Sequence, residues 1–280
     1  MDTLLLVDGS NLLFQMFYGM PARIVNSQGR AIHGTLGFVG ALLKIIKMVS
    51  PTHIAVLFDG ESTNPRYSLD SDYKANRPDY SETTEEETPF SQLPDIFSAL
   101  KFLRIPFAET TACETDDWVS GYAHTYGKSC KIVISSFDSD YFQLVSENVS
   151  VLRYRGEKTQ ICTPLFVQDK FGVKPCQYAD FKCLVGDTSD NIKGASKVGP
   201  KTAKELISQF KSLENILKNC DEISKPAIKA SIIEGRERLR LNYQLIKLLD
   251  YRPLPFEISE LKYTYQGETT TEVLTAIGIK

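Results

Sequence analysis

The feature that most constrains the fold is an alternation of short apolar runs and helical patterns over the first 165 residues. The apolar runs predict four buried strands, at Thr3–Val7, Ile54–Phe58, Lys131–Ser135 and Val149–Arg153. Between them, apolar residues at helical spacing predict helices at Thr35–Val49, Gln92–Leu103 and Asp116–Tyr126. Strands separated by helices are typical of a mostly parallel sheet covered by helices on both faces. We therefore predict an α/β core.

Two departures from this rhythm divide the chain. Residues 61–91 are polar, contain three prolines and carry the acidic run Glu85–Glu87, which is typical of a functional or mobile insertion. From about residue 164 the pattern becomes helical, with candidate helices at 164–171, 177–185, 200–210, 213–218 and 225–249. We expect a core over 1–170 that includes the 61–91 segment, then a helical subdomain and tail over 171–280. The last thirty residues show only weak strand signals.

Acidic residues follow three of the predicted strands directly. They are Asp8, Asp59 and the pair Asp138 and Asp140. Five more acids stand at the start of a predicted helix or in the loop 186–191, namely Glu114, Asp116, Asp117, Asp187 and Asp190. Because the carboxyl ends of parallel strands meet at one edge of a sheet, we expect these side chains to converge there.

Each acid taken singly also has an ordinary explanation, since acids cap helix starts and stabilise turns. Nine carboxylates at one end of a sheet would repel one another strongly without a cation. Oxygen ligands favour Mg²⁺ or Mn²⁺, and no Cys/His cluster suggests a zinc site. Two such ions form the arrangement used for in-line phosphodiester hydrolysis, in which one activates water and the other stabilises the leaving oxygen.

Six short motifs occur in the order found in one known family. They are VDGSN at 7–11, FD at 58–59, YKANR at 73–77, ETDD at 114–117, DSD at 138–140 and GDTSDN at 186–191. Together they are highly specific, and over about residues 3–250 the chain resembles the bacterial and phage 5′-nuclease (flap endonuclease) family. It is similar to the 5′→3′ exonuclease domain of DNA polymerase I. No polymerase segment follows, so we expect a stand-alone nuclease.

The resemblance implies a PIN/resolvase-like core, a helical arch within 61–91 and a helix-hairpin-helix over about 186–210. It implies Mg²⁺-dependent cleavage of DNA 5′ flaps and 5′ ends in replication or repair. By position, the first ion would be held by Asp8, Asp59, Glu114 and Asp116, and the second by Asp138, Asp140, Asp187 and Asp190. Asp117 would support one or both ions.

Cationic residues stand near the acids. Lys74 and Arg77 are three residues apart, so a helical turn would place them on one face, as would also hold for an ordinary solvated surface. The resemblance implies that both lie at the base of the arch and contact the scissile phosphate. We expect Arg66 and Tyr73 to contact DNA, although a tyrosine there is also typical of simple packing. Gln15 stands where polymerase-linked relatives usually have arginine, which would remove one phosphate contact.

Residues 193–204 predict a duplex-binding hairpin. Gly194 and Gly199 allow close backbone approach, Pro200 suits a first helical turn, and amides at a helix start can hold a phosphate. The candidate DNA-binding residues are Lys193, Gly194, Lys197, Gly199, Lys201, Thr202 and Lys204. An ordinary helix connection is the alternative. The resemblance implies K⁺ bound by loop carbonyls, but Lys197 stands where the family usually has glycine.

Composition places few limits on this interpretation. The formal net charge is −3, and because nine of the 35 acids belong to the predicted cluster, the remaining residues carry +6. A slightly acidic total therefore agrees with a DNA partner.

We expect a monomer in the cytoplasm, associated with the nucleoid, with six free cysteines and no membrane span. No partner polymerase is identified.

Two alternatives remain at this point. A PIN-like metal-dependent RNase would share the acidic edge, but the hairpin at 194–204 argues against it. A junction-binding protein with a degenerate nuclease site would lack some of the acids, whereas this chain retains all nine.

Overall fold

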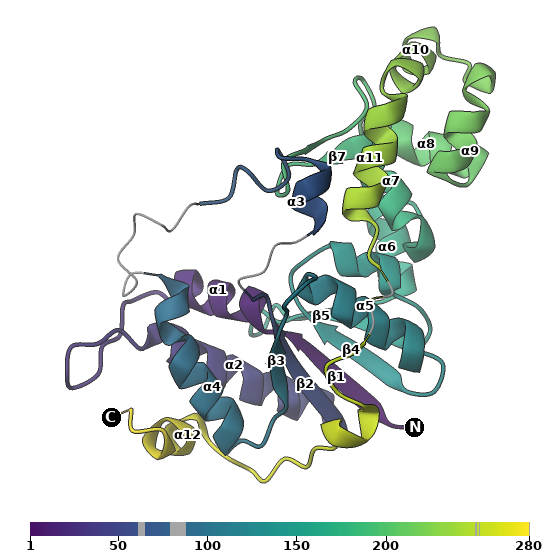
Figure 1. The fold of residues 1–280 in the computed structure, drawn as a ribbon. Helices are drawn as coiled ribbons and strands as arrows, with labels where there is room; N and C mark the ends of the chain where they lie inside the picture. Colours follow the sequence, from purple (N-terminus) through teal and green to yellow (C-terminus); the bar gives the residue numbers. More distant parts are fainter. Residues whose placement is uncertain (61–64, 79–87, 250, 252, 280) are drawn as a thin grey trace.

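The structure is a computed structural model that describes residues 1–60, 65–78, 88–249, 251 and 253–279 (Figure 1). Its centre is a six-stranded sheet with the strand order β3-β2-β1-β4-β5-β6. The strands are β1 Thr3–Asp8, β2 His53–Phe58, β3 Phe107–Glu109, β4 Lys131–Ser135, β5 Val149–Arg153 and β6 Gln160–Cys162. All neighbours pair in parallel except β5 and β6, which are antiparallel. This confirms the mostly parallel α/β sheet.

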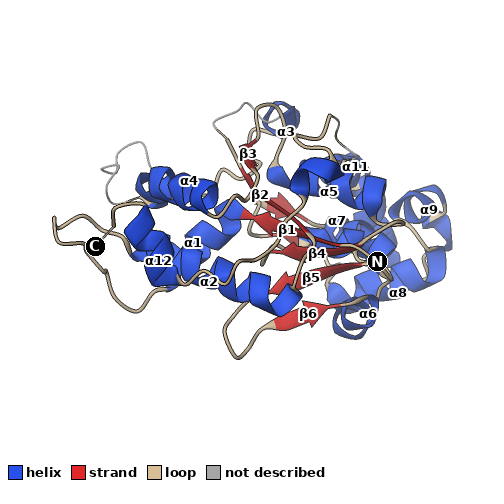
Figure 2. Ribbon diagram, turned by 90° about the horizontal axis from the view of Figure 1, so that it is seen from below, coloured by secondary structure: helices blue, strands red, loops and turns tan. Residues whose placement is uncertain are grey.

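Helices flank both faces of the sheet (Figure 2). The core helices are α1 Gly9–Gly19, α2 His33–Val49, α4 Leu93–Phe102, α5 Thr115–Tyr126 and α6 Pro164–Phe171. Side chains alternate across β1, so Leu5 and Val7 pack with apolar residues of α1, α2 and α4. Leu4 and Leu6 pack on the opposite side with residues of α5. The alternation explains why β1 is apolar throughout, as a central parallel strand must be.

The second part of the chain is helical, as expected. It contains α7 Tyr178–Val185, the short strands β7 Gly186–Asp187 and β8 Ile192–Lys193, α8 Pro200–Phe210, α9 Leu213–Lys218, α10 Pro226–Glu234 and α11 Arg236–Ile246. The single helix expected over 225–249 is divided at Gly235 into α10 and α11. One apolar cluster runs from the sheet face through α5 into these helices, so the two parts share a core.

Helix α3, Pro65–Leu69, is the only regular element of the 61–91 segment before residue 88 among the described residues. It lies beside β7 and α11 rather than against the sheet (Figure 1). Residues 61–64 and 79–87, which include Glu85–Glu87, lie outside the described residues. The part of the expected arch that can be placed is therefore its first half, residues 65–78.

The C-terminal residues return to the core. Helix α12, Thr270–Ala276, packs near α2 and α4, with Leu274 and Ile279 against Ile32. The weak strand signals become no strand within 253–279, where one isolated bridge joins Lys262 to His53. Short 3-10 turns lie at Pro89–Gln92, Asp140–Leu144, Pro175–Gln177, Cys220–Glu222 and Ile258–Leu261. Over the described residues, every helix is too short or too polar to cross a bilayer.

Candidate metal centre

The first part of the site is built by the carboxyl ends of β1 and β2. Asp8 caps α1 by accepting a hydrogen bond from the Asn11 amide at 2.9 Å, and it also accepts one from the Ser136 hydroxyl at 2.9 Å. Burial, together with the negative charges of Asp59 and Asp138, raises the pKa of Asp8 to about 7. A buried carboxylate near two like charges is the electrostatic state that a bound cation relieves.

The start of α5 brings two more carboxylates to this edge. The Thr115 amide donates to Asp59 at 2.9 Å, which ties the helix start to the end of β2. Asp116 accepts a hydrogen bond from the Tyr141 hydroxyl at 2.8 Å. Burial and the charges of Asp138 and Glu114 raise the pKa of Asp116. Asp8, Asp59, Glu114 and Asp116, the residues predicted to hold the first ion, are therefore electrostatically coupled at this edge.

Asp117 faces a different partner. Its two carboxylate oxygens accept hydrogen bonds from both terminal nitrogens of Arg66 at 2.8 Å, and one also accepts from the Leu249 amide at 3.0 Å. Arg66 further donates to Glu114 at 2.7 Å. Because Arg66 and Asp117 are both buried, this is an internal ion pair. Asp117 therefore holds Arg66 in place beside Glu114, and its two carboxylate oxygens are occupied by this ion pair.

The structure places Arg66 and Tyr73, both expected to contact DNA, inside the protein. The exposed fractions of the two residues are 5% and 3%. The Tyr73 hydroxyl donates to Glu114 at 3.2 Å, and its ring packs against that of Tyr67. Both side chains point into the protein because α3 and the turn after it are packed against α5 and α11. Their contacts are internal, and neither presents a free surface to a base or a phosphate.

The second group of acids lies between β4 and β7. Ligand oxygens of Asp140, Asp187 and Asp190 all lie within 4.8 Å of one another, close enough to bind one ion. Asp138 accepts a hydrogen bond from the Asp140 amide at 2.8 Å. Its charge also raises the pKa values of buried Asp8 and Asp116, so Asp138 lies between the two groups.

Lys182 of α7 is a site residue that sequence reasoning missed. Its ammonium forms ion pairs with Asp140 and Asp187, and its side chain is only 8% exposed. Despite burial, the charges of these two aspartates raise the pKa of Lys182, which therefore remains cationic. The available signal was a lone lysine inside the apolar stretch Phe181–Val185, one helical turn before the GDTSDN motif. A buried lysine in such a position requires anionic neighbours.

Lys74 and Arg77 lie at the edge of the acids. The Lys74 ammonium forms an ion pair with Glu114, and its backbone has a positive φ of 57°, a conformation that non-glycine residues rarely adopt. Arg77 forms an ion pair with Asp190 at 2.9 Å, and its side chain is 52% exposed. Lys74 therefore faces the first group and Arg77 the second, with Arg77 open to solvent. Gln15 donates to the Tyr154 carbonyl at 2.8 Å.

The donor set fits divalent cations. Nine carboxylates converge among the described residues, whereas four cationic side chains contact them, those of Arg66, Lys74, Arg77 and Lys182. The nine carboxylates and four cations leave a net charge of −5, and four carboxylates have no ion pair among the described residues, those of Asp8, Asp59, Asp116 and Asp138. The ligand atoms are all hard oxygens. Burial of charge without compensation is costly, and Mg²⁺ and Mn²⁺ are the ions such ligands prefer.

This electrostatic state predicts an unusual pH dependence. Because the pKa of Asp8 is about 7 in the folded chain and near 4 when unfolded, the folded state binds more protons between these pH values. The free energy of unfolding in EDTA should therefore fall, by up to about 4 kcal/mol from this residue, as the pH rises from about 4 to about 7. Urea unfolding at a series of pH values measures this, and Asp8→Asn should flatten the slope. A stability that rises over this range in EDTA would contradict the electrostatic interpretation.

The hairpin between α7 and α8 is tightly built. Gly186 has a positive φ of 89°, and a side chain at Gly194 would meet the carbonyl oxygens of Leu184 and Val185 at 2.4 and 2.5 Å. Lys197 adopts a left-handed φ of 61°, which is the conformation that a glycine would supply without strain. Exposed lysines surround this loop at 193, 197, 201 and 204, with Gly199 exposed and Thr202 partly buried.

The K⁺ expectation has less support than the hairpin itself. The Ala195 carbonyl accepts from the Val198 amide at 3.1 Å, and the Ser196 carbonyl accepts from the Ser231 hydroxyl. Each of these two loop carbonyls therefore has one of its two lone pairs occupied by a hydrogen bond.

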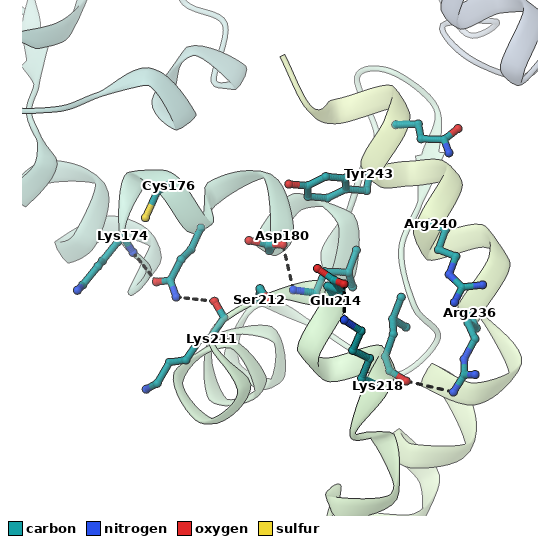
Figure 3. A pocket seen from close by; sticks show the side chains of 14 residues that line it. Lys174, Cys176, Asp180, Lys211, Ser212, Glu214, Lys218, Arg236, Arg240 and Tyr243 are labelled. Carbon is teal, nitrogen blue, oxygen red and sulfur yellow. Dashed lines mark hydrogen bonds and ion pairs between the residues drawn. The ribbon is translucent and has the colours of Figure 1, made fainter. Parts of the chain in front are cut away.

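A cavity of about 940 Å³ lies elsewhere, among α7, α9 and α11 (Figure 3). Its lining includes Lys174, Asp180, Lys211, Arg240 and Tyr243. Asp180 accepts from the Leu213 amide at 3.0 Å and so serves the start of α9. None of the nine converging carboxylates lines this cavity, which is therefore separate from the candidate metal centre.

A parallel sheet with carboxylates at its carboxyl edge, joined to a lysine-rich helical hairpin, defines a metal-dependent phosphodiester hydrolase. Two family models cover nearly the whole chain: a 5′-3′ exonuclease N-terminal resolvase-like domain matches residues 3–172, and a 5′-3′ exonuclease C-terminal SAM fold matches 173–269. The chain belongs to the 5′-3′ exonuclease family.

Individual relatives agree with this assignment. The chain is 35% identical to a 5′-3′ exonuclease of Aquifex aeolicus, over 93% of this chain and 86% of that protein. It is 31% identical to DNA polymerase I of Bacillus subtilis over 97% of this chain, and spans 30% of that polymerase. The fold matches the bacteriophage T5 D15 flap endonuclease in a complex with DNA and metal ions, with a TM-score of 0.73 and 22% identity over 87% of this chain and 88% of that one.

Proposed function

We propose that the chain hydrolyses phosphodiester bonds of DNA at 5′ flaps and 5′ ends, using two divalent ions, in replication or repair. The observation that carries the proposal is the convergence of two acidic groups on one sheet edge, with Asp138 between them. The DNA complex of the T5 D15 flap endonuclease, which shares the fold, supports DNA as the substrate class. A division near residue 170, where the two family matches meet, supports a nuclease core followed by a DNA-binding part.

The carboxylates would hold the ions in two groups. Asp8, Asp59, Glu114 and Asp116 would bind one, and Asp138, Asp140, Asp187 and Asp190 the other. Divalent ions in such a pair activate a water molecule for attack and stabilise the leaving oxygen. The chain supplies rigid placement, since Asp8 is fixed by Asn11 and Ser136, and Asp116 by Tyr141. Carboxylates held in this way need little rearrangement when DNA binds.

Lys74 and Arg77 would bind the scissile phosphate. Both are fixed beside the acids by ion pairs with Glu114 and Asp190, yet Arg77 remains half exposed. Glu114 and Asp190 would then be shared between these cations and the bound ions, and the Lys74 ammonium and the Arg77 guanidinium would be available to a phosphate beside them. Guanidinium and ammonium groups placed there favour the additional negative charge that develops on the phosphate during hydrolysis.

The hairpin would grip duplex DNA at a distance from the reacting bond. The exposed lysines at 193, 197, 201 and 204 surround the start of α8, where backbone amides can also bind a phosphate. Contacts of this type recognise the backbone, so we expect specificity for junction shape rather than for sequence.

Lys201→Ala tests the hairpin directly. We expect weaker duplex binding in EDTA and a salt slope shallower by about one unit, because one phosphate contact and its released counterion are lost. Fluorescence anisotropy over a series of salt concentrations measures both. Lys128→Ala, at an exposed lysine in the turn after α5, makes the same charge change and should leave the slope unaltered. An unchanged slope for Lys201→Ala would exclude this contact.

The decisive experiment is a gel of products from a labelled 5′-flap duplex with Mg²⁺, beside a matched RNA flap and a flap-free duplex. The proposal expects metal-dependent release of the DNA flap or of short 5′ products. Preferential cleavage of the RNA flap would indicate a PIN-like RNase instead. Binding without cleavage across Mg²⁺ and Mn²⁺ titrations would indicate a junction-binding protein with a degenerate site.

A further inference from the structure

The segment that carries Lys74 and Arg77 is anchored to the helical part of the chain as well as to the start of α5. We call residues 65–78 the clamp segment. The Lys74 amide donates to the Asp190 carbonyl at 3.0 Å, and the Asn76 side chain donates to the Thr188 carbonyl at 2.8 Å. In return, the Asn191 side chain donates to the Asp72 carbonyl at 2.8 Å. The clamp segment and the loop between β7 and β8 therefore hold each other through backbone and side-chain contacts.

A second anchor joins the clamp segment to α11. Arg238, in the first turn of α11, forms an ion pair with Asp70 at 2.6 Å. Asp70 has an exposed side-chain fraction of 10%, and its other oxygen accepts from the Asp72 amide at 3.0 Å, which shapes the turn leading to Lys74. Helix α3 lies along α11, with Arg66 near the end of that helix at the Lys247 carbonyl and Asp70 near its start. Arg238 thus fixes the end of α3 closest to the two cations.

The same helix also contacts the hairpin, one helical turn beyond Arg238. The buried Asn242 side chain donates to the Lys193 carbonyl at 2.8 Å and to the Cys183 carbonyl at 3.2 Å. Ser231 of α10 donates to the Ser196 carbonyl. A cavity of about 220 Å³ between the hairpin and the α10–α11 turn is lined by Gly194, Ser196 and Arg238. Helix α11 therefore touches the duplex-binding loop and the clamp segment within two helical turns.

We infer that α11 couples duplex binding to the placement of Lys74 and Arg77, and that Arg238 and Asp70 are positioning residues that make efficient cleavage depend on an adjacent duplex. The inference rests on the proposed function, because it assumes that the hairpin binds duplex and that the two cations bind the scissile phosphate. A duplex that orders the hairpin also orders α11 through Asn242 and Ser231, and α11 holds the clamp segment through Asp70. A single strand, which does not engage the hairpin, lacks this support.

The test compares a 5′-flap duplex with a single-stranded oligonucleotide of the same flap sequence. In the wild type, kcat/KM should favour the flap duplex. Arg238→Ala and Asp70→Asn should each reduce that preference about tenfold, mainly through kcat for the duplex substrate. Duplex affinity in EDTA should remain within about twofold of the wild type, because neither residue belongs to the lysine-rich hairpin. Asp70→Asn keeps the acceptor for the Asp72 amide and removes only the charge.

Three controls separate coupling from general damage. Arg240→Ala, also on α11 but paired with exposed Glu237, should leave the preference unchanged. The double variant Asp70→Asn with Arg238→Ala should lose no more of the preference than either single variant, because both substitutions remove the same ion pair. Hydrogen–deuterium exchange in EDTA should show that duplex DNA protects residues 65–78 in the wild type and in Arg240→Ala, but less in Asp70→Asn.

The outcomes are distinguishable from failure of the proposed function. If the wild type cleaves neither substrate, the proposed function fails, while the exchange experiment still tests the coupling. Three results would each overturn the inference. One is an equal loss of kcat/KM on the flap duplex and on the single strand, and another is an unchanged preference for the duplex in both single variants. The third is protection of residues 65–78 by duplex DNA that persists in Asp70→Asn.

Discussion

Asp138→Asn is expected to lower the rate of flap cleavage by a factor of about 10²–10³ or more, while DNA binding in EDTA persists or strengthens. Asp138 lies between the two acidic groups, and its charge acts on buried Asp8 and Asp116 on one side and on Asp140 on the other. Asparagine keeps the size and the acceptor for the Asp140 amide but removes the charge that would bind an ion. Loss of repulsion toward phosphate explains why binding without metal should not weaken.

The measurement is single-turnover cleavage of a labelled 5′ flap at saturating Mg²⁺, together with anisotropy of the same substrate in EDTA. Asp169→Asn makes the same chemical change at an exposed position on α6 and should preserve both properties. Cleavage by Asp138→Asn at the wild-type rate would remove Asp138 from the metal site. Parallel loss of binding and cleavage would point instead to a folding defect.

Lys182→Met is expected to reduce the free energy of unfolding by about 3 kcal/mol in EDTA, because it removes the cation that neutralises Asp140 and Asp187 inside the protein. Methionine keeps most of the side-chain volume, so the loss reports mainly on charge. A divalent ion at the same carboxylates would supply the missing positive charge. The difference between the variant and the wild type should therefore shrink when Mg²⁺ or Mn²⁺ is added.

Urea unfolding with EDTA and with saturating divalent ion measures both effects. Lys218→Met provides a control, since Lys218 pairs with Glu214 on the exposed surface of α9 and should contribute little in either condition. If the deficit of Lys182→Met stayed constant on adding metal, the ion would not be sharing carboxylates with Lys182, and the placement of the second ion at Asp140 and Asp187 would be wrong.

The acids at strand ends could be predicted because their placement follows from local pattern and one general rule. Asp8 and Asp59 follow buried apolar runs, and parallel strands deliver their carboxyl ends to one edge. The split of 225–249 at Gly235 and the missed helix α1 show where local pattern was insufficient. The apolar residues of α1 are spread around the helix, so their spacing did not distinguish it from the strand before it.

Other features depended on contacts between residues far apart in the chain. Arg66 meets Asp117 and Lys182 meets Asp140 across separations of 51 and 42 residues, and neither contact follows from spacing. Arg66 and Tyr73, for which a DNA contact was expected, are buried because α3 packs along α11 and the following turn meets α5, which turns both side chains inward.

The sequence by itself therefore determined the parallel sheet, the acidic edge and the glycine-containing hairpin, because periodicity, strand ends and backbone freedom are local properties. Only the tertiary structure decided which charges neutralise one another. Arg66 became an internal partner of Asp117, Lys182 a counter-ion of the second acidic group, and Arg238 an anchor of the clamp segment. Electrostatic energy depends on distance and burial, and both are set only when distant segments pack together.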